Sequence, residues 1–507
     1  MSTTTRSGFR SISVDLIVST LKILIPLLIG LVVGALLVMF SNNSKMLMVL
    51  IVGSAGLSWV CVMFMLKYEI NYWFVFITYF ALPLPFGISF FYRELIPFEV
   101  SANGFELTII DLCAIGMWVL WIGHRFIFAD LKKPVDWAWP LLIPCLLLLI
   151  INTLSASFTP YPFFAFSIVF SHIKMIALFL ILTNILSDER MVPFAVWGMI
   201  LALGLQGVIG MEQKLVGAIF TAENMGRAVE LKMQIGQQII SRVAGTLDHP
   251  NNFAMFLNLL IPIAVYYAWQ ARKFRIRLIV GGAIFAGVMA EVFSGSRSGW
   301  IALMAALALT VPLWLYYKEG KNPLVGMTIF GVIGAIVFGG LFAASASFRD
   351  RLLLDDHGTA EVRYPLMEVA ENMIIANPIT GVGVNHYTHY MSAYDRTADA
   401  ISFVYPFPVH NTFMLVAGET GIFSMILIVI QFVATILVAL RGFLTTDGAP
   451  GAVSLGIIAS MVTLMIHNLG NPSAFYEDQP LYVLMATAAA VRRMGISRQE
   501  EAARNGE

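Results

Sequence analysis

Four side chains in the second half of the chain have types and surroundings that suit chemistry on a phosphorylated substrate. Arg242 lies in "SRVAGTLDHPNNFA", Arg297 in "FSGSRSGW" and Arg363 in "AEVRYPLMEVA". A guanidinium group stays protonated and presents a planar fork of N–H donors that fits phosphate oxygens. His410 stands in "YPFPVHNTFMLVAGETG", and imidazole is the usual general base because its unperturbed pKa of about 6.5 is near neutral. These residues predict phosphate binding combined with proton abstraction.

Each of these side chains also has a structural alternative. An arginine at a membrane surface commonly binds lipid head groups or caps a helix end, and a histidine at a helix start commonly serves as a hydrogen-bond partner. Arg297 fits the structural alternative least, because small residues surround it and let a ligand approach the backbone. Asn411, next to His410, could orient an acceptor or the imidazole.

Motifs for nucleotide or metal chemistry are missing from the sequence. It contains no Walker loop, and no D-x-D pair lies on the segments expected outside the membrane. The "HxxH" at residues 386–389 is too weak a pattern to predict zinc. Cys61, Cys113 and Cys145 lie in apolar stretches and are expected to pack rather than to form disulfides. We therefore expect a reaction that needs no metal and no cofactor.

The composition indicates that the elements that position these residues lie in a membrane. The chain is 58% hydrophobic and 12% charged, with a mean hydropathy of +0.80, whereas soluble domains carry about 25% charged residues. The 31 basic residues balance the 31 acidic ones, so no global field attracts nucleic acid. The sequence predicts an all-α polytopic inner-membrane helix bundle of about 12–14 transmembrane helices with a large external loop.

Fourteen apolar stretches are candidates for spans of about 20 residues. They are residues 21–40, 46–66, 71–92, 108–128, 139–157, 163–186, 192–212, 251–270, 277–294, 298–317, 324–344, 412–440, 452–469 and 476–491. The first stretch lacks a small-residue cleavage site and is expected to be a retained anchor. The excess of Lys and Arg on alternate loops predicts that both termini are cytoplasmic.

This orientation places two long loops outside the membrane, residues 213–250 and 345–411. Five residues in the second loop fall at helical spacing and predict an amphipathic helix that ends before Pro378. They are Val362, Leu366, Val369, Ala370 and Met373. Its apolar face would lie on the membrane surface or cap the bundle.

The same scheme divides the chain into five parts. They are an N-terminal transmembrane bundle (1–212), an external loop (213–250), a transmembrane core with the Arg297 turn (251–344), the large external loop (345–411) and C-terminal helices with a cytoplasmic tail (412–507). Lys174, near the middle of the sixth span, marks either a buried ion pair or a pathway. Asp111, Glu291 and Glu419 are its candidate partners, and His467 and Asn468 are expected to be structural.

Four motifs together resemble the O-antigen ligase and polysaccharide polymerase superfamily of bacterial membrane enzymes. They are "RVAGTLDHPNNFAMFL" at 242–257, "SGSRSGWIAL" at 294–303, "RYPLMEVAENMIIANPITGVGVNHY" at 363–387 and "HNTFMLVAGETGIFSM" at 410–425. Each is weakly specific alone, but their order, spacing and expected placement on outer loops make the resemblance specific. The first 200 residues match only as generic spans.

The resemblance implies a metal-independent, inverting glycosyltransferase that moves a glycan from undecaprenyl pyrophosphate to an acceptor hydroxyl on the periplasmic side. Arg242, Arg297 and Arg363 would bind the pyrophosphate, and His410 would deprotonate or orient the acceptor. Asn252, Gly381, Gly383 and Asn411 would support the site, with the glycines turning the loop tightly over sugar. Those supporting residues are Asn252 in "DHPNN", the two glycines of "GVGVNHY" and Asn411 in "VHNTF".

The implied partners are a lipid-linked glycan, membrane lipids and an acceptor, which is lipid A–core for a ligase or growing polysaccharide for a polymerase. Chain-length regulators or export proteins are further expected partners of such an enzyme, and nucleic acid is not. The shared motifs do not choose between ligase and polymerase. A transporter of lipid-linked sugars or small solutes is the alternative class, and it would predict polar or broken spans at the membrane midplane in both halves.

Overall fold

The structure is a computed structural model that describes residues 70–84, 87–93, 101–127, 135–216, 232–235, 238–247, 249–344, 349, 362–472 and 478–505. The chain divides into two compact units, residues 1–76 and 77–507. Of the first unit only residues 70–76 are described, as the start of helix α3 (Ile70–Phe80). Everything below concerns the second unit. The predicted spans 21–40 and 46–66 lie outside the described residues.

Eight helices in the described residues are long and apolar enough to cross a membrane, which confirms an all-α polytopic membrane protein. They are α5 (Trp139–Phe158), α6 (Pro162–Ile185), α7 (Val192–Leu215), α8 (Pro250–Gln270), α9 (Phe274–Ser294), α10 (Arg297–Glu319), α17 (Ile422–Thr445) and α18 (Gly448–His467). Three further predicted spans are also helical but are not among the eight: α4 (Ile109–Ile127), α11 (Pro323–Ala344) and α19 (Gln479–Asn505).

Two predicted spans differ from the structure because backbone breakers interrupt them. The stretch 71–92 is not one helix: α3 ends at Phe80, ahead of Pro83, and the chain turns into a hairpin of β1 (Gly87–Phe90) and β2 (Phe105–Thr108). The stretch 412–440 is split at Gly421, whose φ is +89°, into α16 (Thr412–Thr420) and α17. A Cβ at Gly421 would collide with the backbone oxygen of Ile379, so a glycine is required there.

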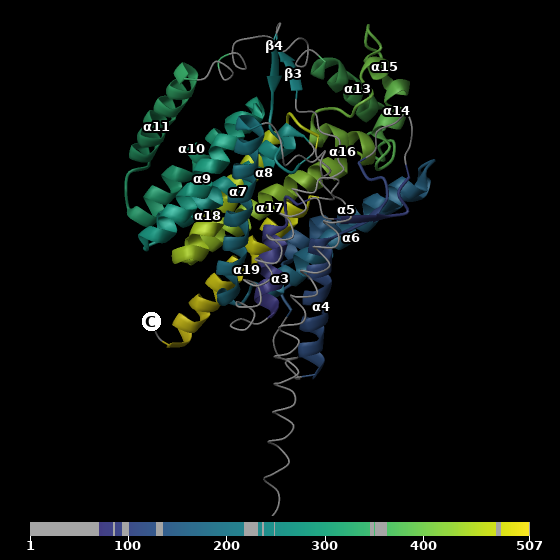
Figure 1. Ribbon diagram of the computed structural model, residues 1–507. Helices are drawn as coiled ribbons and strands as arrows, with labels where there is room; N and C mark the ends of the chain where they lie inside the picture. The colour runs from purple at the N-terminus through teal and green to yellow at the C-terminus, as the bar shows by residue number, and fades with distance from the viewer. Residues whose placement is uncertain are drawn as a thin grey trace, which may run out of the picture. The chain divides into compact units, whose positions relative to one another are not determined.

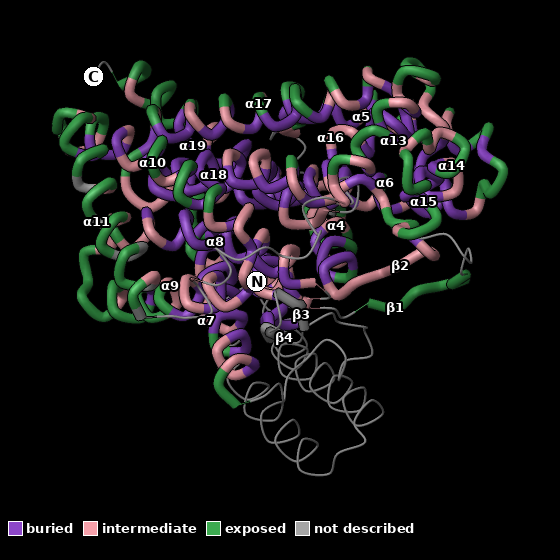
Figure 2. Tube along the Cα trace, turned by 90° about the horizontal axis from the view of Figure 1, so that it is seen from above, coloured by how far each residue is buried: buried purple, intermediate pink, exposed green. Residues whose placement is uncertain are grey.

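The helices pack so that α18 lies in the middle. It contacts α8, α10 and α17, while α7 packs on α9 and α19 joins α17 to α6. Figure 2 shows α8 and α18 largely buried and α11 largely exposed. Large apolar side chains point outward from α9 and α10, among them Phe285 and Ile301, each more than 60% exposed. Outward apolar faces of this kind suit contact with lipid.

The two predicted external loops contain secondary structure of their own. The first carries a hairpin of β3 (Lys232–Ile235) and β4 (Gln238–Ser241). The second carries α13 (Arg363–Ala376), α14 (Tyr387–Tyr394) and the one-turn helix α15 (Ile401–Val404), which group around α16 in Figure 1.

The amphipathic helix predicted in the second loop is confirmed as α13. Its residues Leu366, Val369, Ala370 and Met373 are fully buried, and the helix ends at Ala376, ahead of Pro378. The apolar face does not lie on a membrane surface. It packs against α14, α15 and α16 to form a core of the loop itself. The loop is therefore a packed layer, and α13 holds Arg363 on a rigid element.

Candidate functional site

Four helix N-termini come together around the C-terminal end of α18. The backbone N–H of Thr412, the first residue of α16, donates to the carbonyl oxygen of Asn468 at 2.9 Å. The Nδ2 of Asn471 donates to Oδ1 of Asn252 in the first turn of α8 at 3.0 Å. A Cβ at Gly470 would lie 3.8 Å from both Arg363 Nη1, on α13, and Ser298 Cβ, on α10. Helix N-termini present unpaired N–H groups and partial positive charge, so this convergence favours anions.

Arg242 is held firmly at this convergence. It follows β4 directly and is only 9% exposed. Its Nε donates to the carbonyl oxygen of Ser294 at the end of α9, and its Nη2 donates to Oδ1 of Asn251 in α8, both at 2.7 Å. Glu291, buried one turn below Ser294, interacts electrostatically with Arg242 and accepts from Asn258 Nδ2 at 3.0 Å. Arg242 thus ties the start of α8 to the end of α9.

Arg297 is the first residue of α10, at the tight turn that the sequence predicts. Gly295 ends α9 with a left-handed φ of +64°, and the Ser296 side chain caps α10 by accepting from the backbone N–H of Gly299. The arginine itself is half-buried. Because its backbone lies at a helix N-terminus, its guanidinium group adds a full charge to a position that already favours anions.

Arg363 and His410 are electrostatically coupled. Burial, followed by the positive charge of Arg363, lowers the pKa of His410 to about 4. Its ring packs near Tyr405, with 6.4 Å between ring centroids. Among the described residues, Nδ1 of His410 is buried and has no hydrogen-bond partner. His410 is therefore a neutral imidazole at neutral pH, able to accept a proton.

The predicted supporting residues mainly fix the backbone and the helix ends around the site. Asn411 is the N-cap of α16, because its Oδ1 accepts from the backbone N–H groups of Phe413 and Met414 at 3.0 and 3.1 Å. Asn252 accepts from Asn471 as described above. Neither contact involves the imidazole of His410, and the orienting role of Asn411 stays a prediction.

Gly381 and Gly383 let the loop pack closely on the end of α16. Their φ values are +61° and +121°, and Gly383 N–H donates to the carbonyl oxygen of Glu419 at 2.8 Å. A Cβ at Gly381 would collide with the Glu419 backbone, and one at Gly383 with the side chain of Thr159. The contact between these glycines and sugar stays a prediction.

A small pocket of about 50 Å³ lies beside this loop. Its lining comprises Ser101, Asn385, Tyr387, Thr388, Pro408, Leu415 and Glu419. Burial raises the pKa of Glu419 to about 7, against backbone hydrogen bonds that lower it. Pro408 of this lining is two residues from His410 in sequence, although His410 itself does not line the pocket. Sequence reasoning missed it because three distant segments line it.

Sequence reasoning also missed the part that the end of α18 plays. His467, Gly470 and Asn471 lie in "HNLGNP", where polar residues follow directly after a buried apolar helix. His249, the N-cap of α8, accepts from the Asn251 N–H at 3.0 Å through Nδ1. In the sequence, histidine and asparagine residues cluster at the start of α8 and at the end of α18. That clustering alone does not show that the two helix ends meet.

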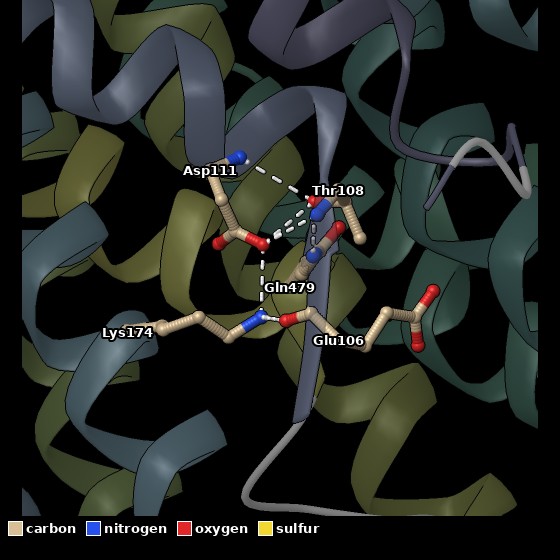
Figure 3. Close-up of polar contacts among 5 residues, drawn as sticks. All are labelled: Glu106, Thr108, Asp111, Lys174 and Gln479. Carbon is tan, nitrogen blue, oxygen red and sulfur yellow. Dashed lines mark hydrogen bonds and ion pairs between the residues drawn. The ribbon is translucent and has the colours of Figure 1, made fainter. Parts of the chain in front are cut away.

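Lys174 forms the predicted ion pair, and Asp111 is its partner. The Nζ of Lys174 lies 2.8 Å from Asp111 Oδ2 and donates to the Glu106 carbonyl oxygen at 2.5 Å. Asp111 also accepts from the N–H and Oγ1 of Thr108, which in turn accepts from Gln479 (Figure 3). This cluster joins α4, α6 and α19 and contains none of the elements around the arginines. In the described residues no group of three His, Cys, Asp or Glu could hold a metal.

The described helices define the class of the protein, an all-α polytopic membrane protein. Arginines lie at several of the helix ends that converge at the end of α18.

Comparison with known families finds that residues 282–429 match the O-antigen ligase family model, so this part of the chain is similar to that family. The match covers less than a third of the chain. It includes Arg297, Arg363 and His410 and leaves out Arg242 and the end of α18. No curated protein matches the chain.

Proposed function

We propose that the protein is a glycosyltransferase that moves a glycan from undecaprenyl pyrophosphate to an acceptor hydroxyl at the periplasmic face of the inner membrane. One observation carries the proposal: the helices that begin at Arg297 and Arg363 meet at the end of α18, and the charge of Arg363 acts on His410. Arg242 is bonded to the start of α8, which reaches the same place. The family match supports glycosyl transfer of the ligase or polymerase type.

In this reaction the anomeric carbon of the donor glycan exchanges its bond to a pyrophosphate oxygen for a bond to the acceptor oxygen. The acceptor oxygen forms the new bond to the anomeric carbon from the face opposite the leaving group, which inverts that carbon. The bond to the pyrophosphate oxygen breaks, and the lipid pyrophosphate leaves with the electron pair. Arg242, Arg297 and Arg363 stabilise the negative charge that grows on it. The acceptor hydroxyl proton goes to His410, whose imidazole is neutral at neutral pH and, within the described residues, has a free ring nitrogen position for it.

The proposal needs no nucleotide and no metal, because the donor carries its energy in the bond to pyrophosphate. The site would be periplasmic and both termini cytoplasmic, in line with the distribution of Lys and Arg along the sequence. The acceptor is a lipid A–core sugar for a ligase and a second lipid-linked repeat for a polymerase.

The first test is a glycan analysis of cells that lack the protein, with reintroduction of the intact chain as control. Accumulated lipid-linked polymer with bare lipid A–core means ligase. Accumulated single repeat units without polymer mean polymerase. Unchanged surface glycans with no lipid-linked intermediate would contradict glycosyl transfer and bring the transporter alternative forward.

A further inference from the structure

The end of α18 buries four polar atoms that have no hydrogen-bond partner of ordinary geometry among the described residues. They are both amide atoms of the Asn468 side chain and both ring nitrogens of His467, one of which makes only a weaker contact with the backbone of Asn251. Both side chains are 0% exposed. Buried polar atoms in native proteins are nearly always paired with protein or ordered water. Two adjacent residues with this feature therefore indicate a place where a polar ligand completes the structure.

The end of α18, where these two residues lie, contacts the start of α16 next to the candidate base, and also Arg363 and the start of α10. The carbonyl oxygen of Asn468 accepts from Thr412 N–H at 2.9 Å, two residues after His410. The charges of Arg363 and His249 both act on the ring of His467. Two residues further on, Gly470 faces Arg363 and Ser298. The pair therefore belongs to the same convergence of helix ends, although it lies outside the segment that matches the family model.

The chemistry of the pair suits hydroxyl groups better than phosphate. A carboxamide offers both donors and an acceptor, and a neutral imidazole offers one of each. A sugar hydroxyl also donates and accepts, so it can satisfy both kinds of atom. A phosphate group offers only acceptors at neutral pH and would leave Asn468 Oδ1 and the acceptor nitrogen of His467 unpaired.

We propose that His467 and Asn468 form a sugar-hydroxyl subsite of the glycan-transfer site, next to the pyrophosphate-binding arginines. The inference rests on the proposed function and adds its sugar-recognising residues. The hydroxyl comes from the donor glycan or from the acceptor glycan. Since both side chains are fully covered by protein, neighbouring side chains must move aside when the sugar enters.

The test uses the full chain reconstituted in liposomes, with the lipid-linked glycan that accumulates in cells lacking the protein and with the acceptor extracted from the same cells. Asn468→Leu removes both amide atoms at nearly equal volume. Thr463→Val is the matched control, because Thr463 is equally buried about one turn earlier in α18. Within the described part of the chain its hydroxyl bonds to the Ala459 carbonyl of its own helix and to nothing else. His467→Leu and His467→Gln form a second pair, in which glutamine restores a donor and an acceptor.

We expect Asn468→Leu and His467→Leu each to raise KM for one glycan substrate about tenfold or more, as the loss of a hydrogen-bonded hydroxyl predicts. Thr463→Val should transfer at the wild-type rate, and His467→Gln should recover part of the loss. A raised KM for the donor assigns the hydroxyl to the donor glycan, and a raised KM for the acceptor assigns it to the acceptor glycan.

A binding measurement with undecaprenyl pyrophosphate that carries no sugar separates this subsite from the phosphate site. Both leucine variants should bind the bare lipid as the wild type does. Wild-type KM values in both leucine variants, or equally weakened binding of the bare lipid, would overturn the subsite. A fall in melting temperature that accounts for the lost activity would also overturn it. That result would mean that the polar atoms of His467 and Asn468 bind buried water and stabilise the fold. A wild-type chain that transfers no glycan would instead overturn the proposed function.

Discussion

Two regions of the molecule hold charged side chains among apolar helices, and they differ in what surrounds the charge. At Lys174, every contact is made within the protein: an ion pair with Asp111, a backbone carbonyl, and a threonine that Gln479 fixes in turn (Figure 3). At the end of α18, Arg242 donates to two neutral oxygens, while Nδ1 of His410 and both amide atoms of Asn468 have no hydrogen-bond partner in the described residues.

The difference separates structural charge from functional charge. A buried ion pair whose two charges meet each other and further protein groups is compensated within the chain, and its removal acts on stability. Under the proposed function, the guanidinium, imidazole and carboxamide groups at the helix N-termini would instead be completed by a substrate that brings negative charge and hydroxyl groups. Substitutions at the Lys174 ion pair should therefore change mainly the stability of the fold, and substitutions at the end of α18 should change mainly turnover.

Charge reversal at the arginine site should give the largest effect on turnover. Arg297→Glu places a negative charge where the leaving pyrophosphate develops its own, so transfer should fall by more than about 10³-fold, beyond the effect of deleting one stabilising donor. The side chain is half-buried at a helix N-terminus, and the protein should still insert. The measurement is glycan transfer at equal amounts of membrane-inserted protein.

Arg297→Lys serves as the control for this substitution. It keeps the charge and loses the planar fork, so it should retain intermediate activity. Transfer by Arg297→Glu at a rate comparable with the wild type would remove the pyrophosphate role and the contrast with Lys174.

Removing the candidate base should give the next largest effect on turnover. His410→Gln keeps a polar side chain that cannot take a proton, and kcat should fall about 100-fold, at the lower end of what general bases contribute. His389→Gln is the matched control. His389 lies on α14 and packs against Tyr161, whereas His410 packs against Tyr405. Equal losses in the two variants would contradict a specific role for His410.

The sequence alone predicts the membrane class, most helix positions and α13, because apolar length and helical periodicity are local properties. It does not predict the breaks after Phe80 and at Gly421, where local breakers override an apolar run. Arg297 could be singled out from its small neighbours. The contribution of His467 and Asn468 could not, because it depends on α16 meeting α18, a contact between residues 412 and 468 that no periodicity encodes.

Breaking the ion pair should change stability rather than chemistry. Lys174→Met leaves Asp111, whose side chain is 5% exposed, buried without its counter-charge, which costs about 3–5 kcal/mol. Lys174→Met combined with Asp111→Leu should recover much of this loss, since no uncompensated charge remains. Thermal unfolding in detergent measures both, and the double variant should transfer glycan at a rate within a few-fold of the wild type. A stable double variant without transfer would make the ion pair part of the catalytic site.

The smallest expected effect tests the coupling of Arg363 to His410. Burial and the Arg363 charge together lower the pKa of His410 to about 4, and transfer requires the neutral base, so activity should be lost as pH falls through that value. Arg363→Met removes the positive charge beside His410 and leaves the burial of the imidazole in place. The pKa should rise while staying below its ordinary value of about 6.5, and the acidic limb of the kcat profile should move to higher pH.

Arg363→Lys separates charge from geometry, because it retains the positive charge and alters the phosphate contact. Its acidic limb should coincide with that of the wild type even where its turnover is lower. Assays begun directly after a pH jump keep acid unfolding out of the profile, since a buried neutral histidine also destabilises the folded chain as pH falls below its unfolded pKa. An acidic limb that stays in place in Arg363→Met would mean that Arg363 does not act on the base, and that the arginine site and His410 function independently.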